Sequence, residues 1–258
     1  MTEPIGKYGG YGMAKGSSPA FYALPGTQAW QDYLNLLHVP YTLWHLSYVV
    51  LGAAIAPAVH LDRLLGTLLA FFLAVGIASH ALDELKDRPL GTKIPPAVLV
   101  ALAAVSMAGA VALGVVAGIL ETRWMFFFVA FGGFIVVSYN FGLWHNRFHT
   151  DFWFAFSWGA FPVLTAYWVN ALRFDAAVVM LAVACFLLTL VQRTLSTPVK
   201  TIRRKALKVE GYIELASGER LNLDSKSIIS VPERALLLLG AAIVVLATAL
   251  LVFRLQNQ

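Results

Sequence analysis

The chain has 258 residues, of which 59% are hydrophobic and only 13% charged. This composition leaves too little polar surface to cover a fold in water, so it excludes an ordinary soluble globular protein and indicates a membrane protein. The net charge of +5 does not indicate nucleic-acid binding, because the basic residues are concentrated in loops between apolar segments, where membrane topology is the usual cause. The single cysteine, Cys185, excludes a disulfide framework and a cysteine-based metal site.

Residues 1–37 form a tail rich in glycine, proline and aromatic residues, without the apolar core of a secretory signal. The rest of the chain holds apolar runs close to the length of about 20 residues that crosses a bilayer as a helix. The runs are residues 41–60, 64–85, 95–119, 124–144, 152–171, 175–195 and 233–254. They are continuously apolar rather than alternating, which favours helices over a barrel. The sequence therefore predicts an all-α polytopic membrane protein with about seven transmembrane helices.

The lysines and arginines predict the orientation of these helices. Most lie in the tail, in the loops after the second, fourth and sixth runs, and at the start of the seventh. The opposite face holds only Arg63, Arg123, Arg173 and Arg254. The positive-inside rule therefore places the N-terminus in the cytoplasm and the C-terminus on the other side.

Between residues 206 and 230 the pattern changes. Apolar and polar residues alternate on both sides of Ser217 and Gly218, which is typical of a small β-hairpin. The predicted organisation is a cytoplasmic tail (1–37), a six-helix membrane bundle (38–200), a cytoplasmic basic linker with the hairpin (201–232) and a C-terminal transmembrane helix (233–258).

The strongest chemical signal closes the second predicted span. Four polar residues recur there with the spacing of one helix face: His80, Asp83, Glu84 and Asp87. A charge inside a membrane costs roughly 2.5 to 3.5 kcal/mol at the centre and less toward the interface, so three clustered acids need a reason. One interpretation is a solvated helix end whose acids pair with Lys86 and Arg88. The other is a divalent-metal site, in which two carboxylates one turn apart share a Mg²⁺ ion that also holds a phosphate.

Other polar residues are predicted at the same membrane face. They are His38, Tyr41 and His45 before or within the first span, Tyr139, Asn140, His145, Arg147, His149 and Asp151 around the end of the fourth, and Gln192, Arg193, Thr194, Ser196 and Thr197 at the end of the sixth. Only one histidine, His60, is predicted at the opposite face. Such convergence indicates a partly desolvated polar pocket beneath an apolar bundle, which is typical of a membrane enzyme with an amphiphilic substrate.

The stretch from His80 to Pro89 resembles the first aspartate motif of the UbiA-type intramembrane prenyltransferases. That family closes its second helix with an Asn-Asp-x-x-Asp-x-x-x-Asp stretch, usually followed by Arg-Pro. Here Asp83 and Asp87 match the spacing, Arg88 and Pro89 match the dipeptide, and His80 stands near the family's asparagine.

A second part of the resemblance follows the fourth span. Tyr139 and Asn140, then a basic loop, then Trp158, Gly159 and Pro162 are similar to the family's fourth loop and fifth helix. The resemblance covers roughly residues 38–200 and implies a UbiA-like helical bundle.

The chain also departs from the family. Residues 192–200, where the family carries its second aspartate motif, contain no acid, and the chain has about seven predicted spans where the family normally has nine. The resemblance then implies that a diphosphate is held by one cation on Asp83 and Asp87 together with Arg147, Arg193 and Lys200, because arginine matches phosphate geometry.

On this resemblance we expect an enzyme that transfers a prenyl group from an isoprenoid diphosphate to a lipophilic acceptor within membrane lipid, with Mg²⁺ as cofactor. The residues implied are Asp83, Asp87 and His80 in catalysis, the same three with Glu84 as metal ligands, and His45, Tyr139, Asn140, Arg147, His149, Arg193 and Lys200 in substrate binding.

Two other interpretations stay open. The first is an iron or zinc enzyme acting on a lipid, whose imidazole and carboxylate ligands would be His45, His80, His145, His149, Asp83, Glu84 and Asp87. The second is a non-catalytic lipid- or pigment-binding membrane subunit, for which loss of the second acidic motif is the expected mark.

Overall fold

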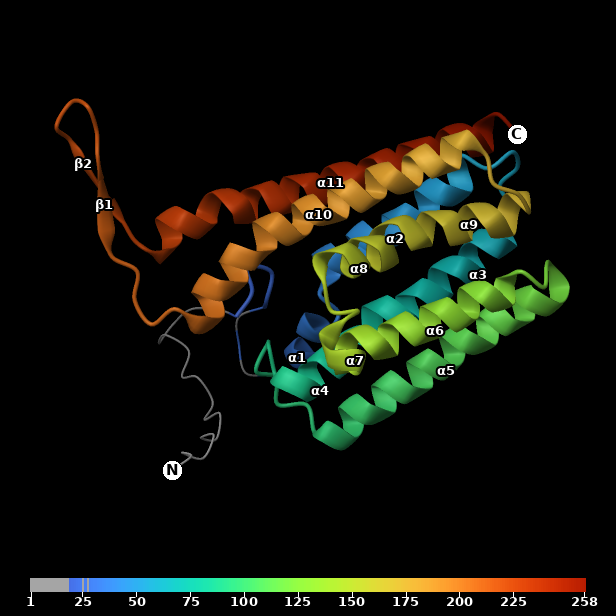
Figure 1. Cartoon of the computed structure of the whole chain (residues 1–258), viewed down its shortest axis with the longest axis horizontal. Coiled ribbons are helices and arrows are strands. Elements are labelled where there is room, and N and C mark those ends of the chain that lie inside the picture. Colours follow the sequence, from blue (N-terminus) through green and yellow to red (C-terminus); the bar gives the residue numbers. More distant parts are fainter. Residues whose placement is uncertain (1–18, 25, 27) are drawn as a thin grey trace.

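The computed structural model describes residues 19–258 except residues 25 and 27. In this part of the chain, long helices run side by side in alternating directions and form one bundle (Figure 1). The elements in chain order are α1 (Ala29–Leu36), α2 (Val39–Ala54), α3 (Leu61–Phe71), the π-helix η1 (Phe72–Ser79), α4 (His80–Asp87), α5 (Pro96–Leu120), α6 (Met125–Phe141), α7 (Leu143–Asn146), α8 (Asp151–Ala155), the π-helix η2 (Phe156–Ala160), α9 (Phe161–Ala171), α10 (Ala176–Lys205), β1 (Gly211–Glu214), β2 (Arg220–Leu223) and α11 (Ser225–Gln256). Residues 1–18 of the predicted tail lie outside the described residues, and α1 is a helix within that tail where none is expected.

Four helices in the described part of the chain are long and apolar enough to cross a membrane. They are the continuous helix Leu61–Asp87, made of α3, η1 and α4, and the helices α5, α10 and α11. The chain is therefore an integral membrane protein. The three remaining predicted spans also fold as helices, in α2, α6 and the run from α8 through η2 to α9. Because α2 has 16 residues and α6 has 17, the count of seven spans stays a prediction.

Helix α10 is longer than the sequence predicts. The predicted span ends at residue 195, but the helix continues through Pro198 to Lys205. Proline normally ends or kinks a helix because it lacks the N–H group of the backbone ladder, which is the reason for the early predicted end. The extension carries Lys200 and Arg204 on a helix rather than on a linker, one turn apart and therefore on the same face.

The predicted hairpin is confirmed. Strands β1 and β2 pair antiparallel, with Ile213 opposite Leu221, and Gly218 in the turn has a φ of +84°, a conformation that glycine adopts without strain. Helix α11 then begins at Ser225 rather than at residue 233, because the Asp224 carboxylate accepts a hydrogen bond from the backbone of Ser227 at 2.7 Å and caps the helix. The hairpin extends away from the bundle at the end where α1 and α4 lie (Figure 1).

The largest buried cluster joins α2, α9, α10 and α11 around large aromatic side chains, including Trp44, Tyr48 and Tyr167. The Trp44 indole donates a hydrogen bond to the Tyr48 hydroxyl at 2.5 Å, which satisfies a polar group inside the bundle. Gly159 of η2 packs directly on α10, since a methyl group at Gly159 would lie 2.7 Å from the carbonyl oxygen of Cys185. This packing holds η2 directly against the middle of α10.

Candidate functional site

The start of α2, α4 and the last turns of α10 lie at one end of the bundle (Figure 1). Polar side chains from these elements gather there. We call this group the Lys200 cluster. It consists of His38, Tyr41, His45, His80, Asp83, Arg193, Lys200 and Arg204.

Lys200 is the residue with which most other members of the cluster interact. Its ammonium nitrogen lies 5.8 Å from the centre of the Tyr41 ring. Its charge interacts electrostatically with three histidines and one acid from two other helices: His38, His45, His80 and Asp83. The continuation of α10 past Pro198 is what brings Lys200 to this position.

The surroundings of Asp83 carry more positive than negative charge. This half-buried carboxylate interacts electrostatically with Lys200 and Arg204 of α10, with Lys86 of its own helix and with His149. One carboxylate facing several basic groups creates a positive local potential, which suits an anionic ligand such as a phosphate.

Two histidine rings pack against each other inside the cluster. The ring centres of His38 and His80 are 4.1 Å apart. The Nδ1 atom of His80 lies 3.1 Å from the carbonyl oxygen of Gly76, so Nδ1 carries the proton and Nε2 is left as an acceptor. The Nε2 atom of His38 is buried without a hydrogen-bond partner among the described residues. Such atoms are rare in folded proteins and need a ligand, a water molecule or a functional reason.

The pKa of His38 is lowered well below its ordinary value, first by burial and then by its neighbours His80, Lys200 and Arg204. His38 is therefore uncharged in the folded protein at neutral pH. The unfolded chain binds a proton at His38 below about pH 6.5, whereas the folded chain does not, so stability falls as the pH drops through that value.

We expect this acid sensitivity to decrease in His38→Asn, because asparagine does not titrate and tolerates the left-handed backbone at position 38, where φ is +46°. The measurement is the melting temperature in detergent from about pH 7.5 to about pH 5. His145→Asn, an exposed histidine that also has a positive φ, is the matched control. An unchanged pH slope in His38→Asn would show that His38 is not the titrating group.

Of the predicted ligand residues on α4, Glu84 has a structural role. Glu84 is only 1% exposed. One carboxylate oxygen accepts the backbone N–H of Leu90 at 3.0 Å, and the other accepts the N–H of Thr92 at 2.8 Å. Glu84 thus binds the loop that follows α4 back onto the helix, and both of its oxygens are already engaged.

The other acids of α4 differ in exposure. Asp83 is half-buried and faces Lys200, whereas Asp87, one turn later, is exposed. In the described part of the chain, no three His, Cys, Asp or Glu side chains are arranged to hold a metal ion. Asp83 and Asp87 stand one helical turn apart on α4, and a Mg²⁺ ion held by these two carboxylates with water and phosphate stays a prediction. Glu84 does not fit as a third ligand, because its oxygens accept backbone N–H groups.

Tyr139 and Asn140, at the end of α6, lie beside the cluster together with His149, which lies between α7 and α8. The rings of Tyr139 and His149 stack with centres 4.3 Å apart, and the Nδ1 atom of His149 lies 2.9 Å from the carbonyl oxygen of Tyr139. The Asn140 amide donates to the Ser79 hydroxyl at 3.1 Å and so links α6 to η1. These contacts place the imidazole of His149 within electrostatic reach of Asp83.

Of three other predicted residues, Arg193 belongs to the cluster and has further partners of its own, whereas Arg147 and His145 lie outside it. The Arg193 guanidinium donates to the Asp151 carboxylate at 2.8 Å and lies over the Phe154 ring, 4.9 Å from its centre. Arg147 and His145 are exposed in the turn after α6 and are not part of the Lys200 cluster. The structure therefore brings His45, His80, Asp83, Arg193 and Lys200 together and leaves Arg147 and His145 outside.

Two residues of this region, Tyr22 and Arg204, were not predicted as site residues from the sequence. The Tyr22 ring packs edge-on against His38 and Tyr41, each with centres 5.5 Å apart, and burial raises the Tyr22 pKa above its ordinary value. The Arg204 side chain donates to the carbonyl oxygen of Pro19 at 3.2 Å. Arg204 was detectable as the residue one turn after Lys200, but only if α10 is known to continue. No sequence signal marks Tyr22.

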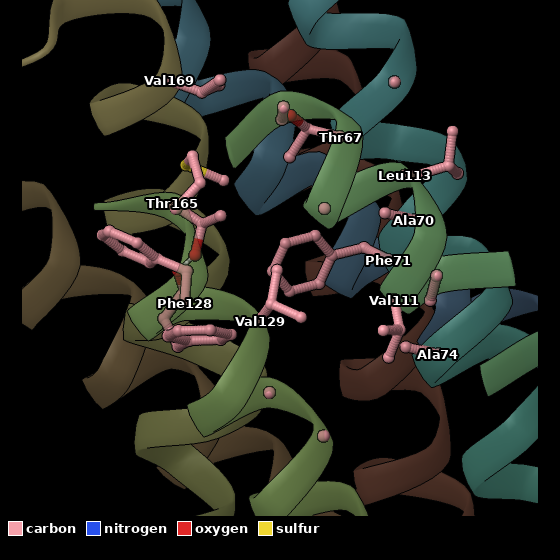
Figure 2. A pocket seen from close by; sticks show the side chains of 18 of the residues that line it. Thr67, Ala70, Phe71, Ala74, Val111, Leu113, Phe128, Val129, Thr165 and Val169 are labelled. Carbon is pink, nitrogen blue, oxygen red and sulfur yellow. Dashed lines mark hydrogen bonds between the residues drawn. The ribbon is translucent and has the colours of Figure 1, made fainter. Parts of the chain in front are cut away.

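An apolar cavity of about 240 Å³ lies deeper in the bundle, between α3, η1, α5, α6, η2 and α9. Figure 2 shows Phe71 of α3 projecting into the space between these helices. Toward the Lys200 cluster the cavity is bounded by Val75 and Trp158, which pack on Tyr139. Trp158 also contacts the cluster, since its carbonyl oxygen lies 2.8 Å from the Nδ1 atom of His45.

Comparisons of the chain with protein-family models, with curated proteins and with solved structures found no match.

Proposed function

We propose that the protein is a UbiA-like membrane enzyme with seven spans, which binds an isoprenoid diphosphate at the Lys200 cluster and transfers the prenyl group to a lipophilic acceptor. The observation that supports this proposal is the position of Lys200 and Arg204 opposite Asp83. In the family that the sequence resembles, a second acidic motif with its own cation would stand at the end of this helix. Here the basic side chains of α10 supply positive charge directly.

The first chemical requirement is to stabilise the leaving diphosphate. When the bond between the allylic carbon and its oxygen breaks, the electron pair leaves with the diphosphate, and Lys200 and Arg204 would neutralise the developing negative charge by charge-assisted hydrogen bonds. A Mg²⁺ ion on Asp83 and Asp87 would add Lewis-acid stabilisation of the same group. The N-terminus and the Lys200 cluster then face the cytoplasm, where the positive-inside rule places them.

The second requirement is to protect and stabilise the allylic cation. Tyr139, Phe154 and Trp158 form a layer between the cluster and the cavity, with the Phe154 and Trp158 rings stacked 5.0 Å apart. Aromatic faces attract cations, and an apolar wall excludes the water that would quench the intermediate. The acceptor supplies an electron pair for the new carbon bond and loses a proton, which the released diphosphate, itself a base, can take.

The test is prenyl transfer by purified protein in nanodiscs, followed by pyrophosphate release and by mass spectrometry of the lipid fraction. Asp83→Asn removes a carboxylate that would hold the Mg²⁺ ion and should lower the rate by about 100-fold or more. Glu219→Gln, the same change at an exposed position of the hairpin, should leave it unaltered. Equal rates in the two variants would refute the mechanism, and tight diphosphate binding without turnover would favour the non-catalytic lipid-binding interpretation.

A further inference from the structure

Two buried polar atoms in the lining of the apolar cavity have no hydrogen-bond partner among the described residues, the Nε atom of Arg63 and the hydroxyl of Ser157. Arg63 is engaged through its other nitrogens, with Glu121 and with the Val169 carbonyl, so Ser157 is the residue left without any partner. Ser157 lines the cavity and is only 4% exposed, and its hydroxyl makes no hydrogen bond within the described part of the chain. The two threonines of the lining differ, since Thr67 donates to the Arg63 carbonyl at 2.7 Å and Thr165 to the Phe161 carbonyl at 2.8 Å. A buried hydroxyl costs free energy unless it is hydrogen-bonded, so Ser157 points to a ligand that carries a hydrogen-bonding atom.

Glycines leave the cavity open rather than filled by packing. A methyl group built at Gly66 or Gly133 meets no atom within 4 Å, and both residues line the cavity. Protein interiors are normally close-packed, and a cavity this large inside a helical bundle is the usual form of a site for an apolar molecule.

The charged residues of the lining lie far from Ser157. Asp62 and Arg63 stand at the start of α3 and Glu121 directly after α5, at the end of the bundle opposite the Lys200 cluster. Arg63 and Glu121 form an ion pair there. A charged group next to Ser157 would therefore be buried without a counter-ion, which is strongly unfavourable. The ligand that fits is uncharged where it meets Ser157.

We infer that this cavity binds an uncharged lipophilic phenol or alcohol, with its hydroxyl on Ser157 and its apolar body along Phe71 and Phe128 toward the Arg63 end. Figure 2 shows the rings of Phe71 and Phe128 beside this space, and the Phe161 ring packs against both of them. Ser157 adjoins Trp158 of the aromatic layer, so the hydroxyl end of the ligand faces the Lys200 cluster. Identifying this ligand as the prenyl acceptor rests on the proposed function, whereas the binding site itself does not.

The test uses a long-chain alkyl phenol that carries a photoreactive diazirine at the end of its chain, with the protein in nanodiscs and without any diphosphate. Peptide mapping should place the crosslinks on α3 and α5 near Arg63 and Glu121. Gly133→Phe fills the cavity and should reduce labelling at least fivefold. Ala104→Phe places the same ring on an exposed position of α5 outside the cavity and should change nothing.

A second comparison isolates the hydrogen bond. Ser157→Ala should weaken binding of the phenol by about 3- to 10-fold, as expected for one hydrogen bond, but should not alter binding of the same probe without its hydroxyl. Equal labelling by both probes in both proteins would mean that the cavity takes only an apolar chain, such as a lipid acyl tail, and would overturn the inference. So would labelling spread over α10 and α11. Asp83→Asn should label like the unaltered protein, so a failure of prenyl transfer is distinguishable from a failure of this site.

Discussion

Replacing Lys200 by glutamine is expected to weaken binding of an isoprenoid diphosphate by about 10- to 100-fold, which corresponds to the loss of one charge-assisted hydrogen bond of about 1.5 to 3 kcal/mol. The effect should be large because Lys200 is the member of the cluster that interacts with histidines of α2 and α4 and with Asp83. Asp83 repels a bound anion, and without the Lys200 charge fewer basic groups remain to offset that repulsion.

The measurement is the dissociation constant of an isoprenoid diphosphate in nanodiscs, by competition with inorganic pyrophosphate. Lys205→Gln, at an exposed position of the same helix, is the matched control and should bind normally. Lys200→Arg keeps the charge and should recover most of the affinity, which a purely structural role of Lys200 would not predict. If Lys200→Gln and Lys205→Gln bind alike, the cluster is not the diphosphate site.

Replacing Glu84 should have the largest effect on stability among the acids of α4. Glu84→Gln turns one of two acceptors into an amide donor that faces a backbone N–H, so we expect a loss of about 2 to 3 kcal/mol in the free energy of unfolding. Glu84→Ala leaves both N–H groups of Leu90 and Thr92 unpaired in a buried loop and should cost about 3 to 5 kcal/mol.

Stability is measured by thermal and denaturant unfolding in detergent. Asp87→Asn is the control on the same helix, and because Asp87 is exposed, its effect should stay within about 0.5 kcal/mol. A Glu84→Gln variant as stable as Asp87→Asn would mean that Glu84 is not needed to hold the loop, and a role as metal ligand would then be open to it again.

Glu84 and Asp83 also show how far the site could be predicted from the sequence. Helical spacing places His80, Asp83, Glu84 and Asp87 on one side of a helix, and α4 has this spacing. The spacing does not reveal what approaches that side. Glu84 meets the backbone of the loop that follows, and Asp83 meets α10. Both contacts depend on tertiary packing, which a single helical period does not encode.

The fold was predictable where the sequence carries a strong local signal. Continuous apolar runs gave the long helices, and alternation around Gly218 gave the hairpin. The two helices that extend furthest beyond their predicted runs both contain proline, since α10 passes through Pro198 and α11 through Pro232. Proline removes one backbone donor but does not end a helix that neighbouring helices hold in place. Local helix propensity carries no information about those neighbours, so both helix lengths were underestimated.

The β-hairpin has a practical consequence. Its tip at Ser217 and Gly218 is exposed, and Gly218 has open space around it, so a short epitope spliced in at this point should be accepted without disturbing the helices. The hairpin leaves α10 at the same end of the bundle as Lys200. Antibody access to such an epitope in intact and in permeabilised cells would therefore report which compartment supplies the ligand of the Lys200 cluster.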